Sequence, residues 1–131
     1  MRVLVDTSVW SLALRHSARS LTAAEQRLTA LLRELIHEGR VAMVGPVRQE
    51  ILSGVRDQET FERLRDRLGA FPDEHVETGD FEEAARCANR CRAVGIAGSA
   101  VDHLICAIAL RRDLAVLTTD RDFARYARVL P

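Results

Sequence analysis

The chain has 131 residues, a length typical of one domain, and its 19 basic and 19 acidic side chains give a formal net charge of zero. Apolar residues make up 47% and charged residues 29%, which is typical of a globular domain and excludes a disordered tail. Every basic residue is arginine, so a Walker A phosphate loop and a Schiff-base mechanism are excluded, because both need lysine.

Membrane insertion and secretion are not indicated by the sequence. No apolar run approaches the ~18 residues of a membrane span, and the first residues lack the basic and apolar regions of a signal peptide. We therefore expect a cytoplasmic protein with no membrane partner. An odd number of cysteines, three, does not indicate a disulfide framework in such a chain, and without a CxxC pattern they are interpreted as buried small hydrophobic residues rather than zinc ligands.

In the first half of the chain, residues 1–5 form an apolar run that predicts a buried strand, followed by a helix capped by Thr7 or Ser8. Thr22-x-x-Glu25 is a capping-box pattern and predicts a helix over 23–38, whose leucine-rich stripe is assigned to core or dimer packing. The elements expected next are a strand over 41–44, a helix after Pro46, a helix over 57–68 and a candidate short strand within 70–76.

The second half continues the alternation of helices and strands. Asp80-x-x-Glu83 predicts a cap for a helix that runs through Val94. A mostly apolar helix over 101–112 follows a loop with two glycines, and the last elements expected are a strand over 114–117, a short helix, and a candidate strand at 129–130. This alternation predicts a single α/β domain over residues 1–131, with a short parallel sheet covered by helices on both faces.

Four acidic residues are predicted to lie at one edge of this sheet, beyond the carboxyl ends of its strands. Asp6 directly follows the first strand, and Asp120 follows the 114–117 strand. Glu50 lies one turn into the helix after the second strand. Asp102 lies in the first turn of an apolar helix, where an ionised carboxylate is costly unless it is paired.

Each acid alone also has an ordinary explanation. Asp6 and Asp120 could cap helices, Asp102 could favour the positive end of its helix, and Glu50 could be a solvated helix residue. Their joint placement at one edge favours a shared site. An all-oxygen site without His or Cys ligands prefers Mg²⁺ or Mn²⁺ to zinc, and these ions suit phosphodiester hydrolysis.

At these residues the chain resembles the PIN-domain family, in particular the VapC-type ribonuclease toxins of type II toxin–antitoxin modules. Four pieces match in the family's order: Val3–Trp10, Gly45-Pro46-Val47 with the Glu50 helix, Val101–Ala109 and Leu117–Phe123. The resemblance implies a PIN-like (Rossmann-like) fold and a Mg²⁺- or Mn²⁺-dependent endoribonuclease whose catalytic acids are Asp6, Glu50, Asp102 and Asp120.

The resemblance also assigns roles within this acidic set. Asp6 and Asp102 are implied as the steadiest metal ligands, Asp120 as a further ligand directly or through water, and Glu50 as the residue that orients the metal or the attacking water. We expect three neighbours to support them: Thr7 and Thr119 as hydrogen-bond donors to the carboxylates, and Asp122 as an outer residue or a cap.

Partners are implied by the same resemblance: an RNA substrate, a homodimer, and a small VapB-like antitoxin that obstructs the acidic cleft in a heterotetramer or larger assembly. Four arginines could contact RNA phosphates, although a solvated surface position is the alternative for each: Arg48, Arg111, Arg112 and Arg121. For His103 a structural role is favoured, because one residue beyond Asp102 turns it about 100° away. Trp10 is expected in the core or at the dimer contact.

Two other functions remain open on the same fold: a PIN-fold nuclease in RNA maturation, and a catalytically idle binding protein, against which the intact four acids argue. A phosphorelay receiver is excluded because the chain lacks lysine. A phosphatase of the haloacid-dehalogenase type needs Asp-x-Asp after the first strand, where this sequence has Asp6-Thr7-Ser8.

Overall fold

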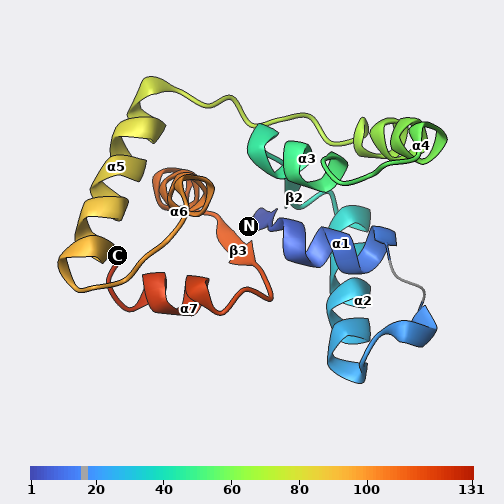
Figure 1. The fold of residues 1–131 in the computed structure, drawn as a ribbon, viewed down its shortest axis with the longest axis horizontal. Coiled ribbons are helices and arrows are strands. Elements are labelled where there is room, and N and C mark those ends of the chain that lie inside the picture. The colour runs from blue at the N-terminus through green and yellow to red at the C-terminus, as the bar shows by residue number, and fades with distance from the viewer. Residues whose placement is uncertain (16–17) are drawn as a thin grey trace.

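A computed structural model describes residues 1–15 and 18–131 of the chain (Figure 1). Its sheet has three short parallel strands in the order β2–β1–β3: β1 (Val3–Val5), β2 (Val41–Ala42) and β3 (Ala115–Leu117). Val3 pairs with Val41 on one side and with Ala115 on the other, so β1 is the central strand. Because both pairings are parallel, all three strands end at the same edge of the sheet. The predicted α/β class with a parallel sheet is confirmed.

The helices of the first half are α1 (Thr7–Arg15), the 3₁₀ helix η1 (Ala18–Ser20), α2 (Ala23–His37), α3 (Gly45–Leu52) and α4 (Gln58–Leu68). The predicted capping box is present at α2: the Glu25 N–H donates to the Thr22 hydroxyl, and the Thr22 N–H donates to the Glu25 carboxylate. Helix α1 begins directly at Thr7, and the carbonyl of Asp6 accepts its first backbone hydrogen bonds. The cap is therefore Asp6, and the prediction of Thr7 or Ser8 is wrong.

The helices of the second half are α5 (Thr78–Ala93), α6 (Ala100–Arg112) and α7 (Asp122–Ala127). Helix α5 begins before the predicted cap: Glu77 is the N-cap residue, and its N–H donates to the Asp80 carboxylate at 2.8 Å. The prediction that Asp80 is the cap is therefore wrong. Its side chain is fully buried and binds Arg111 and Arg112 at the far end of α6.

Three of the expected strands are absent or reduced in the described residues. β2 ends at Ala42, and Met43 forms only an isolated bridge with Asp73, which is all that remains of the strand expected within 70–76. Residues 129–130 follow the end of α7 and form no strand, because both backbone N–H groups donate to the carbonyl of Tyr126.

The core lies around the buried strand β1, between two groups of helices. Figure 1 shows α1 to α4 on one side of the strands and α5 to α7 on the other. Trp10 is buried and packs edge-on against Phe71, with ring centroids 5.2 Å apart, which places it in the core as expected. All three cysteines are buried and free. In the described part of the chain, no helix has the length and apolar character needed to cross a membrane.

The apolar stripe of α2 is only partly used by this core. Leu32 and Leu35 are buried, whereas Leu31 is 41% exposed and Ile36 is 39% exposed. Two further large apolar side chains, Phe81 and Val94 at the two ends of α5, are more than half exposed. These side chains leave apolar surface on both halves of the molecule.

Candidate active site

The acidic residues reach one edge of the sheet from four different elements. Asp6 follows β1 and Asp120 follows β3, while Asp102 lies in the first turn of α6 and Glu50 lies in α3. The N–H of Asp6 donates to the carbonyl of Leu117 at 2.9 Å, which joins the ends of the two neighbouring strands. The local fold therefore brings Asp6 next to the loop that carries Asp120.

Asp6 is a buried carboxylate that is held by two hydroxyl groups. Ser8 and Thr118 each donate to its Oδ2 at 2.9 Å. Both hydroxyls also accept a backbone N–H from the loop after β3, that of Thr119 for Ser8 and that of Asp120 for Thr118, each at 3.0 Å. These acceptor roles direct the hydroxyl protons toward Asp6, so its charge is stabilised and its orientation is fixed.

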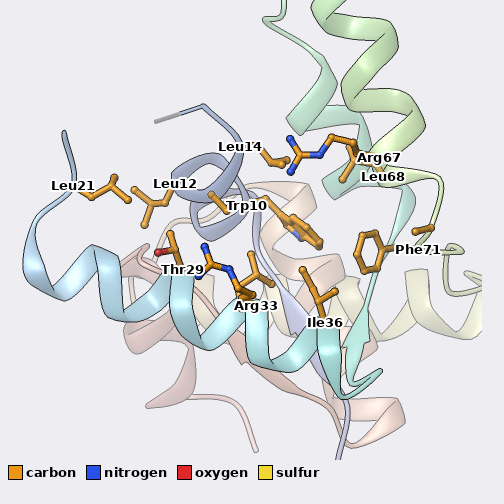
Figure 2. A pocket seen from close by; sticks show the side chains of 13 residues that line it. Trp10, Leu12, Leu14, Leu21, Thr29, Arg33, Ile36, Arg67, Leu68 and Phe71 are labelled. Atoms are coloured by element: carbon orange, nitrogen blue, oxygen red, sulfur yellow. The ribbon is translucent and has the colours of Figure 1, made fainter. Parts of the chain in front are cut away.

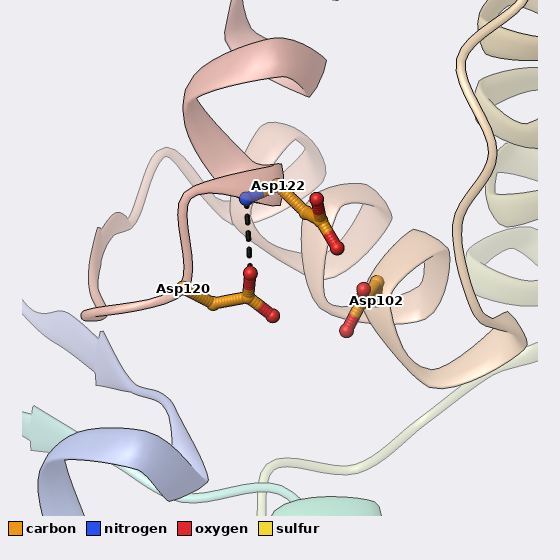
Figure 3. Close-up of side chains that lie close together, drawn as sticks. All are labelled: Asp102, Asp120 and Asp122. Atoms are coloured by element: carbon orange, nitrogen blue, oxygen red, sulfur yellow. Dashed lines mark hydrogen bonds between the residues drawn. The ribbon is translucent and has the colours of Figure 1, made fainter.

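Three aspartates face one another beside this network (Figure 3). Asp102, Asp120 and Asp122 each offer a carboxylate oxygen, and these oxygens lie within 4.8 Å of one another. The Asp122 N–H donates to Asp120 Oδ1 at 2.9 Å, which fixes the turn between them. Asp120 is exposed and the other two are half-buried, so the group is open to solvent on one side.

The donor set of this group fits a small divalent cation. Oxygens bound to one Mg²⁺ at about 2.1 Å lie at most about 4.2 Å apart, so small side-chain rotations suffice to bring the three carboxylates around one ion. Only oxygen ligands are offered, which favours Mg²⁺ or Mn²⁺ over zinc. The resemblance implies Asp6 as a steady ligand, but Asp6 is not one of these three residues. Asp122 was expected to lie outside the set of ligands, but it is one of the three.

Glu50 is tied to the same edge through Thr7. The Thr7 hydroxyl donates to Glu50 Oε2 at 2.9 Å, and Thr7 directly follows Asp6. The Glu50 side chain therefore lies over the start of α1 and stays exposed to solvent. A carboxylate in this position can accept a proton from water.

Sequence reasoning missed three residues that bind the acids: Ser8, Thr118 and Tyr126. The hydrogen bond expected from the Thr119 hydroxyl is made by Thr118, and Thr119 contributes its N–H to Ser8 instead. The strand register explains this, because Val5 pairs with Leu117, so the residues that directly follow the two strands, Asp6 and Thr118, lie close together. Tyr126 donates its hydroxyl to Asp102 Oδ2 at 2.7 Å, and this contact has no sequence signal.

Three of the arginines considered for RNA contact are engaged elsewhere in the fold. Arg48 binds Asp73 and the carbonyls of Leu68 and Phe71. Arg111 and Arg112 bind the buried Asp80. These guanidinium groups hold loops and helices together, so the expected phosphate contacts are not supported for them. Arg121 is exposed next to Asp120 and makes no ion pair within the described part of the chain.

The parallel α/β sheet gathers carboxylates at its carboxyl edge, an arrangement that can hold a divalent cation and support phosphodiester hydrolysis. The model of the PIN domain family matches residues 3–129. Ribonuclease VapC11 of Mycobacterium tuberculosis is 34% identical over 129 residues, which cover 97% of this chain and 92% of that protein. VapC ribonuclease Mb1587 of Mycobacterium bovis is similar to the same extent.

Among solved structures, FitAcB from Neisseria gonorrhoeae has the same fold, with a TM-score of 0.75 at 23% identity, over 97% of this chain and 94% of that one. The chain therefore belongs to the PIN domain family, as a VapC-type member.

Proposed function

We propose that the chain is a Mg²⁺- or Mn²⁺-dependent endoribonuclease and the toxin of a type II toxin–antitoxin module. The observation that carries this proposal is the group of Asp102, Asp120 and Asp122 at the edge of the sheet, whose oxygens lie within 4.8 Å of one another. The similarity to Ribonuclease VapC11 over nearly the whole chain supports RNA as the substrate.

In this proposal Asp102 and Asp120 hold the ion, Asp122 completes the group, and Asp6 contributes from its fixed position beside them. When bound, the ion supplies a more acidic water and neutralises charge that develops on the phosphate. Glu50, held by Thr7, accepts the proton of the attacking water or orients it. Arg121 offers its exposed guanidinium to a neighbouring RNA phosphate.

The antitoxin is proposed to cover an apolar groove of about 470 Å³ between α1, α2 and α4 (Figure 2). Trp10 and Ile36 are among the side chains that line it, and the indole N–H of Trp10 is buried without a partner among the described residues. Arg33 and Arg67 add positive charge. This lining suits an amphipathic segment that carries acidic residues, which is the kind of partner a small VapB-like protein offers.

A homodimer and a heterotetramer or larger assembly with antitoxin are part of the same proposal. The exposed Phe81 of α5 and Val94, the residue that follows this helix, are side chains that a subunit contact would cover. The three free, buried cysteines suit the reducing cytoplasm, where RNA is available as substrate.

The proposal is tested by incubating purified protein with total RNA in Mg²⁺, in EDTA, and as the Asp6→Asn variant. Discrete cuts that require the metal and disappear in the variant are expected, and mapping of the cut ends identifies the target. The contrary outcome is that wild type and variant both leave the RNA intact. If mass spectrometry also finds no small co-purifying protein in either sample, this outcome would favour an idle binding protein on this fold. Cuts confined to one precursor RNA would favour the maturation nuclease.

A further inference from the structure

Tyr126 lies in α7, outside the four acidic motifs, yet its hydroxyl reaches the acidic group. The residue is 1% exposed, and its hydroxyl donates to Asp102 Oδ2 at 2.7 Å. Asp102 is one of the three carboxylates that face one another, and it lies in the first turn of a different helix, α6. The hydrogen bond therefore connects α7 to the candidate ligand.

The phenol ring of Tyr126 is held on two sides. Phe123 packs against it in a T-shaped contact with centroids 5.3 Å apart, and His103 lies tilted against it at 5.7 Å. His103 is itself buried, which agrees with the structural role expected for it. A ring that is packed in this way keeps one rotamer, so its hydroxyl presents a fixed donor.

Gly98, in the loop before α6, provides the space for this contact. A Cβ atom at Gly98 would lie 2.5 Å from the Tyr126 hydroxyl oxygen and 2.8 Å from His103 Nε2. No other residue fits there without displacing one of these groups. A side chain at this position would therefore press on the hydroxyl that donates to Asp102, and glycine leaves that contact undisturbed.

We propose that Tyr126 is a positioning residue that holds the Asp102 carboxylate in place for the divalent cation, with Gly98 giving the hydroxyl its clearance. This inference rests on the proposed function, since it requires Asp102 to bind a metal. The carboxylate keeps lone pairs for a cation while one oxygen accepts the hydroxyl. Hydrogen bonds of this kind to a metal ligand are worth about 10–100-fold in metal affinity or activity.

The test uses Tyr126→Phe, a variant that removes only the hydroxyl. Its Mn²⁺ affinity is measured from the EPR signal of free Mn²⁺, at a temperature below the melting temperature of every variant. The expected result is about 10–100-fold weaker binding, together with RNA cleavage that recovers as Mn²⁺ is raised. The matched control is Leu130→Ala, which loosens packing around α7 without contacting Asp102. This control is expected to lower the melting temperature and leave the Mn²⁺ affinity unchanged.

Asp102→Asn and the double variant complete the test. If Tyr126 acts through Asp102, removing its hydroxyl has little further effect on Mn²⁺ binding once Asp102 is changed. A Mn²⁺ affinity of Tyr126→Phe within about threefold of the wild-type affinity would overturn the positioning role and leave the proposed function intact. Wild-type protein that binds Mn²⁺ but does not cut RNA would refute only the nuclease, and the absence of Mn²⁺ binding in wild type would overturn both.

Discussion

The buried ion cluster around Asp80 allows a stability prediction that does not depend on the active site. Asp80 is fully buried and accepts three hydrogen bonds, from Arg111 at 2.7 Å, from Arg112 at 2.9 Å and from the Glu77 N–H at 2.8 Å. Asp80→Asn keeps the size of the side chain and removes its charge, so Arg111 loses its carboxylate partner and Arg112 keeps a longer ion pair, 3.9 Å, with Glu74. The cluster joins the start of α5 to the end of α6.

Removing one partner of a buried ion pair costs about 3–5 kcal/mol. Here the arginine side chains are 39% and 21% exposed, so water solvates them in part and a cost of about 2–3 kcal/mol is expected. With an unfolding entropy of about 2.1 cal/mol/K per residue, this lowers the melting temperature by roughly 7–11 °C. RNA cleavage at 20 °C should stay unchanged, because about ten residues of α6, roughly 15 Å, separate Asp102 from these arginines.

The assay is calorimetric or circular-dichroism melting of wild type and Asp80→Asn, with Asp66→Asn as the control. Asp66 is 73% exposed and, among the residues that the structure describes, its ion pair is with Arg65, so its charge is well solvated and no shift is expected. A melting temperature of Asp80→Asn within about 2 °C of wild type would refute the reasoning, since it would mean that the cluster contributes no net stability.

Three further predictions concern the loop before α6, the acid limb of stability and the apolar groove. Gly98→Ala is expected to lower the free energy of unfolding by about 1–3 kcal/mol in denaturant melts, because its Cβ would lie 2.5 Å from the Tyr126 hydroxyl oxygen; an unchanged midpoint would contradict this. Burial alone would raise the pKa of Asp80, but the Glu77 N–H and the two arginines outweigh it and lower the pKa below its ordinary 3.8. The stabilisation by the Asp80 charge is then present above about pH 4 and lost as the pH falls through the folded pKa. The difference in melting temperature between wild type and Asp80→Asn should therefore shrink in acid, and a constant difference would argue against this cause. Ile36→Arg, at a position 39% exposed, should leave RNA cleavage intact and prevent inhibition by the cognate antitoxin, whereas full inhibition would remove the groove from the proposed interface.

The strands and helices that the sequence predicts well are those whose pattern is local. The residues of β1 are all apolar and buried, and the capping box at Thr22 is complete in four residues. The strand expected at 129–130 was predicted from β-branched and apolar character alone. A strand of two or three residues forms only where a partner strand presents its backbone, and there the chain turns back on the carbonyl of Tyr126.

The sequence predicts those residues of the candidate site that lie close to the end of a strand or the start of a helix. Asp6 and Asp120 were found because the end of a parallel strand is visible in the sequence. Asp102 was found because it lies in the first turn of an apolar helix, and Glu50 because it lies one turn into the helix after the second strand. Thr118 required the register of β1 with β3, and Tyr126 required the path of α7 back to α6; neither follows from local pattern. The roles of the acids stay predictions.

The central claim is that the aspartate group at the sheet edge holds the ion needed for RNA cleavage. The most direct measurement is the single-turnover cleavage rate of one RNA substrate as a function of Mn²⁺ concentration, for wild type and Asp102→Asn, with Mn²⁺ binding measured on the same samples. The account predicts that wild type shows a saturable Mn²⁺ dependence and that Asp102→Asn loses both binding and cleavage. Cleavage by Asp102→Asn at the wild-type rate, or cleavage that persists in EDTA, would contradict it.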